Sequence, residues 1–158
     1  MLAIVGGFFA MWQWKKAIDL QRAKFIEQII KKLRFNKDMS KALYIVEYTQ
    51  NWYDDKFHGG SKQEFLIDKL LSYLTYICYL LETKHISKDE TKILVYELSR
   101  VFALYSIRAY LWNLYCFTTK HKTICTFQYL IDYGIKHKLL DKSDFNKDCK
   151  KYPKFLNF

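Results

Sequence analysis

Turn-forming residues are scarce in this 158-residue chain, which has one proline, Pro153, and five glycines. A β-sandwich needs turn residues about every 8–12 positions, so a chain with so few of them favours long helices. Hydrophobic residues make up 51% of the sequence. That share excludes a disordered chain and is enough for one core. The sequence therefore predicts a single all-α domain, a helical bundle.

The first fourteen residues, MLAIVGGFFAMWQW, carry no charge, and Lys15 and Lys16 follow directly. A secretory signal has basic residues before its apolar run and a small-residue cleavage site after it, so we expect this segment to stay on the protein. As a helix it rises ~21 Å, against ~30 Å of bilayer hydrocarbon. Three placements stay open: a buried core helix, a helix in the membrane interface, or a short span in a thinned bilayer.

Details of this segment favour the membrane. Trp12 and Trp14 lie beside the two lysines, as in an interfacial aromatic belt, and the positive flank predicts a body on the cytoplasmic side. Small residues spaced four apart let helices approach closely in lipid. Four of them form one predicted face: Ala3, Gly6, Gly7 and Ala10. Residues 1–20 are therefore predicted to begin a membrane-associated helix.

Apolar spacing and capping signals predict the later helices. The first helix continues at helical spacing to about Phe35, and Asn36 or Asp38 can cap the next one. Capping-box pairs open two further helices, at Ser61 with Glu64 and at Ser87 with Glu90. The second of these is expected to run on through Leu114, with or without a kink, and a last helix to begin at Thr123 or Thr126.

A loop over residues 51–61 reads NWYDDKFHGGS and is broken by its glycine pair. Its aromatic residues either contact a partner or fasten the loop onto the bundle, and the second interpretation is favoured. They are Trp52, Tyr53 and Phe57. Asp54, Asp55 and His58 could bind a cation, but no matching ligand motif accompanies them, so a solvated loop is expected. The four cysteines form no CxxC pair, and we expect Cys78 and Cys116 to be reduced core residues.

The formal charge of +10 fits an anionic partner, a lipid surface or nucleic acid, or simply a lysine-rich surface. Helical ribonucleases use an Arg-x(4–6)-His pair, in which Arg stabilises the phosphate and His moves protons. None of the four histidines has an Arg at that spacing, and the nearest pair is Arg108 with His121. We expect Arg100 and Arg108 to form buried ion pairs with carboxylates such as Asp68 or Glu97.

The run WKKAIDLQRAKFIEQIIKKLR after the apolar start, followed by IDKLLSYLTYICYLLETKHIS, resembles an uncharacterised bacterial family of short membrane-anchored helical proteins. The plan also resembles the small membrane accessory proteins encoded beside Cas13b-type CRISPR effectors. That resemblance implies a homo-oligomeric membrane pore in antiviral defence. It also implies a divergent HEPN-like helical domain, in which Arg108 and His121 would be degenerate nuclease positions.

The sequence thus predicts an apolar helix start over residues 1–20, a bundle over 21–140 and a basic tail over 141–158. Its predicted function is that of a non-enzymatic, homo-oligomeric protein that perturbs the bacterial inner membrane, with Gln13, Lys15 and Lys16 near the cytoplasmic mouth. Expected partners are lipid, further copies, and a CRISPR effector or RNA. No cofactor, metal or small-molecule substrate is expected. Two alternatives stay open: an RNA-binding or degenerate ribonuclease domain, and a membrane-tethered adaptor.

Overall fold

The structure, a computed structural model, describes residues 2–49, 51–54, 56–87 and 89–145, with the backbone alone for residues 2–8. All of its regular elements are α-helices, which confirms the all-α prediction. They are α1 (Leu2–Phe35), α2 (Lys37–Tyr48), α3 (Lys62–Glu82), α4 (Lys92–Ala103), α5 (Tyr105–Lys120), α6 (Gln128–Lys136) and α7 (Lys142–Phe145).

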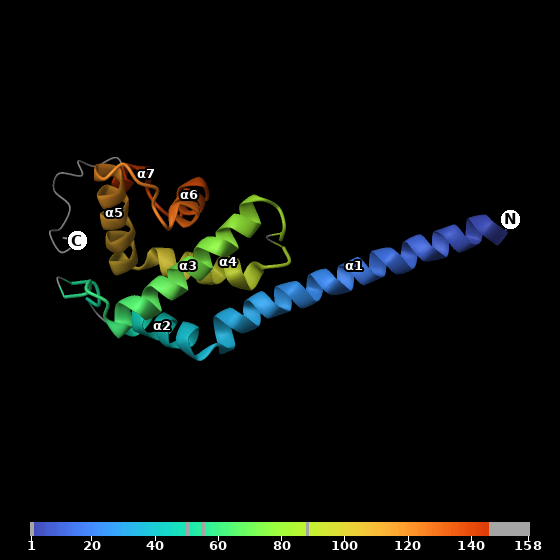
Figure 1. The fold of residues 1–158 in the computed structure, drawn as a ribbon, viewed down its shortest axis with the longest axis horizontal. Helices are drawn as coiled ribbons and strands as arrows, with labels where there is room; N and C mark the ends of the chain where they lie inside the picture. The colour runs from blue at the N-terminus through green and yellow to red at the C-terminus, as the bar shows by residue number, and fades with distance from the viewer. Residues whose placement is uncertain (1, 50, 55, 88, 146–158) are drawn as a thin grey trace.

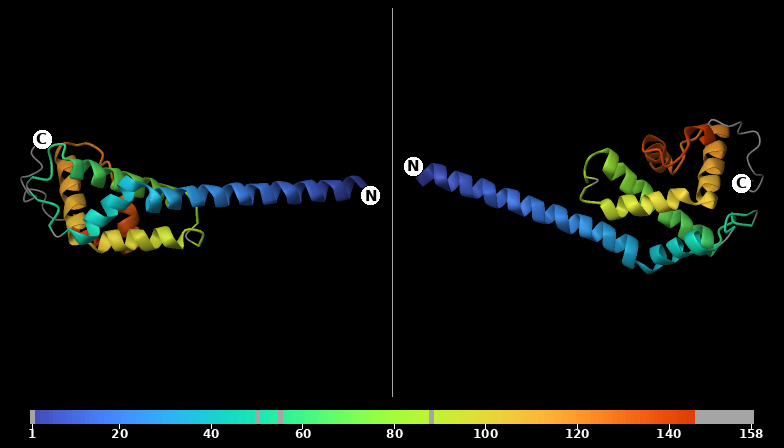
Figure 2. Two further views of the ribbon diagram at one scale, coloured as in Figure 1. Left: turned by 90° about the horizontal axis from the view of Figure 1, so that it is seen from below. Right: turned by 180° about the vertical axis from the view of Figure 1, so that it is seen from behind.

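Helix α1 leaves the bundle as a straight rod, and the N-terminus lies at its far end (Figures 1 and 2). Every residue from 9 to 25 is exposed, and the first buried residue is Ile26. Arg22 forms an ion pair with Glu90, between α3 and α4 (2.7 Å), so at 1.5 Å per residue the part of α1 before Arg22 reaches ~30 Å beyond the bundle. We call residues 9–25 the arm.

The C-terminal third of α1 is anchored in the core. Ile26, Ile29 and Leu33 are buried. The Tyr73 hydroxyl of α3 donates a hydrogen bond to the Ile29 carbonyl (3.0 Å). The chain then turns at Asn36, whose side chain accepts hydrogen bonds from two amides of the first turn of α2, as the sequence predicted for this cap. Anchor and cap together fix the direction in which the arm projects.

Helix α3 is the centre of the bundle and packs against both α2 and α6. The Ser61 hydroxyl caps it by accepting a hydrogen bond from the Glu64 amide (3.0 Å), which confirms the cap, although the Glu64 carboxylate binds the amides of Gly59 and Gly60 rather than that of Ser61. Its predicted apolar stripe is buried: Leu66, Leu70, Leu74, Ile77 and Leu81. Burial on several faces of α3 explains why the hydrophobic residues of this segment are so dense.

Three predicted helix boundaries differ from the structure, and one of them is the start of α6, at Gln128 rather than at Thr123 or Thr126. Ser87 and Glu90 do form a capping box, but α4 begins only at Lys92. The chain is extended at Leu104, so α4 and α5 are separate helices rather than one. The Arg108 guanidinium donates to the carbonyls of Phe102 (3.2 Å) and Ala103 (3.0 Å). These bonds satisfy carbonyls that the helix end leaves without partners, and so stabilise the break.

The cysteines follow the prediction in part. Cys78 is free and buried, as expected, and burial raises the pKa of its thiol. Cys125 is also free and buried. Cys116 is disulfide-bonded, so the prediction that it is reduced is wrong. Its position inside an apolar helical run indicated burial but carried no information on pairing. Cys149 lies outside the described residues.

Candidate functional site

The arm carries large apolar side chains with no cover. Phe9, Met11, Trp12 and Trp14 are 57%, 65%, 56% and 69% exposed. Trp12 lies near the Phe9 ring (6.0 Å between centroids), and the Lys16 ammonium lies 4.9 Å from the Trp12 ring centre. Such cation–π contacts occur on many protein surfaces, and Trp is also enriched at membrane–water boundaries. Monomeric soluble proteins seldom display so many large apolar residues together.

The other residues predicted for this site fall on the same helix. Ala10, Gln13, Lys15 and Lys16 are exposed on the arm. The remaining three, Ala3, Gly6 and Gly7, belong to the helical backbone of α1, and their side-chain environment lies outside the described residues. A pitch of 100° per residue places the four small residues within about 100° of one another around the helix. Across the described residues, no helix combines the length and the apolar character needed to cross a bilayer.

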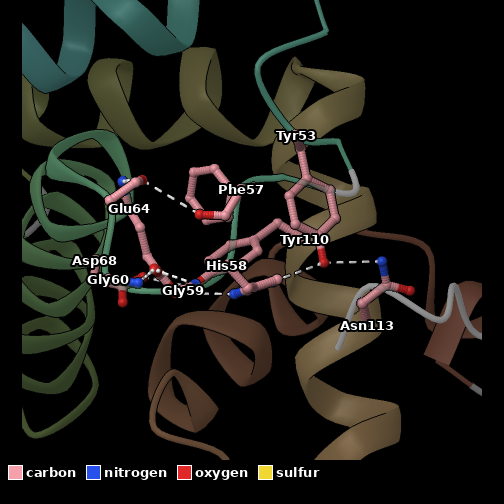
Figure 3. Close-up of polar contacts among 10 residues, drawn as sticks. Tyr53, Phe57, His58, Gly59, Gly60, Glu64, Asp68, Tyr110 and Asn113 are labelled. Atoms are coloured by element: carbon pink, nitrogen blue, oxygen red, sulfur yellow. Dashed lines mark hydrogen bonds and ion pairs between the residues drawn. The ribbon is translucent and has the colours of Figure 1, made fainter. Parts of the chain in front are cut away.

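A buried polar cluster joins the 51–61 loop to α3 and α5 (Figure 3). His58 Nδ1 donates to Glu64 Oε1 (2.9 Å), which leaves Nε2 to accept from the Tyr53 hydroxyl (3.4 Å). The Asn113 amide of α5 donates to the same hydroxyl (3.0 Å). The Tyr110 hydroxyl donates to Asp68, whose carboxyl pKa is raised by burial. The chain of bonds thus connects three separate segments.

The glycine pair of this loop is required by the cluster. Gly59 and Gly60 have φ angles of 129° and 80°, which L side chains rarely adopt. In this conformation both amides donate to Glu64 Oε2, at 3.1 and 2.7 Å. Trp52, Tyr53 and Phe57 are buried against the bundle. The loop aromatics therefore fasten the loop to the bundle, as the favoured interpretation predicted.

The cluster is closed to a substrate. The His58 side chain is 6% exposed and the Glu64 side chain 14%. The Tyr110 ring covers His58, with a stacked centroid distance of 5.7 Å. A general base must reach the group from which it takes a proton, and the described contacts of His58 and Glu64 are with neighbouring groups of the fold. The arrangement is that of a polar contact between helices, not of an active site.

Glu64 makes the cluster sensitive to acid. Burial raises the pKa of its carboxyl, but the hydrogen bonds from His58, Gly60 and Gly59 together lower this pKa by more. The net effect is a pKa below the usual value for a glutamate. A carboxyl whose pKa is lower in the folded state stabilises the fold at pH values above its unfolded-state pKa. That contribution is lost as the pH falls through the folded-state pKa.

We therefore expect Glu64→Gln to lower the free energy of unfolding at about pH 7 and to weaken its dependence on pH between about 5 and 3. Urea titrations followed by tryptophan fluorescence, to which the buried Trp52 contributes, measure both quantities. Asp19→Asn, on the arm, is the control and should leave both unchanged. A variant with the wild-type acid dependence would contradict the role given to Glu64.

A second buried charge ties α1, α2 and α4 together. The Glu97 side chain of α4 is 2% exposed and forms ion pairs with Arg34 at the end of α1 and with Arg100 (3.3 Å). Arg100 also pairs with Glu47 of α2. The sequence predicted that Arg100 and Arg108 pair with carboxylates such as Asp68 or Glu97; Arg100 does pair with Glu97, but Arg34 and Glu47 were not identified. Asp68 instead accepts from Tyr110, and Arg108 binds carbonyls.

The candidate nuclease positions are not brought together. Arg108 lies in the first turn of α5 and His121 caps its last turn, thirteen residues later. Thirteen residues of helix span ~20 Å. The His121 ring packs on Phe117 instead, with centroids 4.4 Å apart. The two side chains therefore cannot act on one phosphate within this chain.

Metal binding at the loop has no geometric support. His58 is held by Glu64, and Asp54 accepts a hydrogen bond from the Lys56 amide (2.9 Å). Asp55 lies outside the described residues. In the described part of the chain, no group of three His, Cys, Asp or Glu side chains could hold a metal ion.

Comparison of the chain with family models, curated proteins and solved structures gives no match.

Proposed function

We propose that this protein is a non-enzymatic, homo-oligomeric membrane protein whose arm inserts into lipid and whose bundle stays in water. One observation carries the proposal: the arm holds its apolar side chains away from the bundle, where nothing in the described chain covers them. Such a surface is stable only against lipid or another protein. The aromatic residues beside Lys15 and Lys16 favour lipid as the first contact.

The size of the apolar surface indicates how strong this attachment is. Full burial of a large apolar side chain contributes about 1.5–3 kcal/mol. For the four exposed side chains of residues 9–14, scaled by their exposed fractions, this gives roughly 4–7 kcal/mol. A single myristoyl chain, with a binding constant of about 10⁴ M⁻¹, gives about 5.5 kcal/mol and only reversible binding. One arm therefore binds reversibly, and stable attachment needs several arms or anionic lipid.

Oligomerisation would explain how so short an apolar segment can function in a membrane. In a ring of arms, each helix meets lipid on one side and its neighbours on the other. The small residues Ala3, Gly6, Gly7 and Ala10 would let neighbouring helices approach closely. Gln13 and the lysines would then lie at the edge of the membrane. This arrangement does not require that a lone helix cross the bilayer.

A vesicle experiment tests the proposal. We expect the full chain to float with vesicles that contain phosphatidylglycerol, to release an entrapped dye from them, and to have the mass of an oligomer in detergent. Binding should weaken as salt rises, because lysines near anionic lipid contribute about 1 kcal/mol each. Lack of flotation would exclude the membrane role, and a monomeric mass in detergent would exclude the oligomer.

Other expectations stay predictions. Lys15 and Lys16 favour a bundle on the cytoplasmic side of the inner membrane, whereas the Cys116 disulfide is typical of an oxidising compartment. Protease protection in spheroplasts distinguishes the two. The antiviral role, the CRISPR effector or RNA as partner, and the HEPN-like fold depend on the resemblance alone. Neither the RNA-binding nor the adaptor alternative has a described site that favours it over the arm.

A further inference from the structure

Exposed apolar residues on the arm recur with the spacing of a coiled coil. Met11, Trp14 and Ile18 follow one another at intervals of three and four, Gln21 takes the next position, and Phe25 the one after that. All five are exposed. A period of 3.5 residues keeps a stripe facing a second helix along its length. We call these five residues the arm stripe.

The same stripe meets the bundle farther along the helix. At the same spacing its continuation is Gln28, which is exposed, and Lys32, whose ammonium lies 4.8 Å from the Tyr73 ring centre of α3. The stripe therefore reaches the bundle only at Lys32, and from Met11 to Phe25 it has no cover within the described chain. One continuous face of α1 is thus partnered at its C-terminal end and bare at its N-terminal end.

We propose that a second copy of this chain covers the arm stripe, with the two arms parallel and in register. The parallel direction follows because both arms begin in the same membrane. This inference rests on the proposed function, since two heptads are too short to associate alone and the membrane raises the effective concentration of the arms.

Charge and polarity at the stripe favour an identical partner. In a parallel pair, the positions that flank the stripe place Ala10 against Lys15 of the second copy, and Ala17 against Arg22 of the second copy. No cation faces another cation in this register, although the arm is strongly basic. Gln21 meets Gln21 of the second copy, so each amide can donate to and accept from the other. An apolar partner would leave that amide without a hydrogen bond.

The bundle sets the extent of the contact. At 100° per residue, the anchoring residues Ile26, Ile29 and Leu33 lie about 75° around the helix from the arm stripe. The bundle therefore leaves the stripe uncovered through Phe25. Tyr73 of α3 lies against the same face at Lys32, so the two helices must diverge after Phe25. The contact is confined to the five residues of the arm stripe.

Two variants that each introduce one glutamate on the arm test the inference. Ile18→Glu puts a carboxylate on the stripe, and Leu20→Glu puts one on the opposite side of the arm, about 200° away. Ile18 and Leu20 are both exposed, at 42% and 57%. Each full-length variant also carries Gln21→Cys, and disulfide cross-linking between copies is measured in vesicles and in detergent.

We expect Gln21→Cys to cross-link efficiently, Ile18→Glu to reduce the cross-linked fraction about tenfold or more, and Leu20→Glu to leave it unchanged. Ala23→Cys, on the opposite side from Gln21, should cross-link no more than the wild-type chain. Equal cross-linking at positions 21 and 23, or equal effects of the two glutamates, would overturn the inference. The detergent measurement does not depend on vesicle binding, so a chain that fails to float counts against the membrane role alone.

Discussion

Replacing Trp12 and Trp14 with glutamine will release most of the protein from vesicles. Both indoles are more than half exposed on the arm, and neither contacts the bundle. Loss of the two rings removes roughly 2–4 kcal/mol of transfer free energy, after allowance for the surface already covered. Partitioning into the membrane should therefore fall about thirtyfold or more. Co-flotation with anionic vesicles, as a function of lipid concentration, measures this change directly.

The bundle provides a matched control for this prediction. Tyr44 and Tyr48 of α2 are each 67% exposed, and their rings lie in contact at a tilt, with centroids 4.5 Å apart. Their replacement by glutamine removes two equally exposed aromatic rings from a surface that we do not place in lipid. Flotation should then be unchanged, and the thermal unfolding of both double variants should match the wild type. Equal loss of flotation in the two would show that membrane binding does not depend on the arm.

Removal of the two cations around Glu97 will have the largest effect on stability. In Arg34→Met with Arg100→Met, the carboxylate of Glu97 stays buried with no cation to balance it. Breaking a buried ion pair from one side costs about 3–5 kcal/mol, because the remaining charge has lost its hydration. The free energy of unfolding from urea titration should fall by about that amount.

A third substitution distinguishes this cause from simple loss of contacts. Glu97→Met in the same background removes the buried charge, and an apolar replacement of a whole buried ion cluster is often neutral or stabilising. The triple variant should therefore recover most of the lost stability. Lys31→Met is the control, because Lys31 pairs with Glu27 at the surface (2.7 Å) and such pairs contribute at most about 1 kcal/mol. A triple variant as unstable as the double would contradict the explanation.

Local chemistry in the sequence was sufficient to predict several elements. Asn36 and Ser61 cap the helices that follow them, because a short polar side chain at that position can reach amides two or three residues ahead. The stripe of α3 follows from spacing alone. The break at Leu104 has no such signal, since neither Gly nor Pro marks it. It is stabilised instead by Arg108, whose contact with the end of α4 forms only in the folded chain.

The polar contacts between distant segments show the same limit. His58 and Glu64 lie close in sequence, but Asn113 reaches Tyr53 from another helix. Arg34 and Glu47 come to Glu97 and Arg100 from α1 and α2. Nothing in the spacing of these residues indicates that they meet, because the packing of the helices decides it. The arm differs: its uncharged run and its lysines are local, so the sequence was sufficient to single it out.

The straight course of α1 has a consequence for the electric field that the bundle experiences. If Lys16 lies at the lipid headgroups and the arm stands upright, the six residues to Arg22, which pairs with Glu90, hold the nearest edge of the bundle ~9 Å above them, and the ten residues to Ile26 hold its core ~15 Å above them. The Debye length at physiological ionic strength is about 8 Å, so the surface potential of the membrane is weakened at that edge and is small at the core. Lysines of the bundle beyond this edge then keep their counterions, and the layer of water beneath the core stays open to small ions.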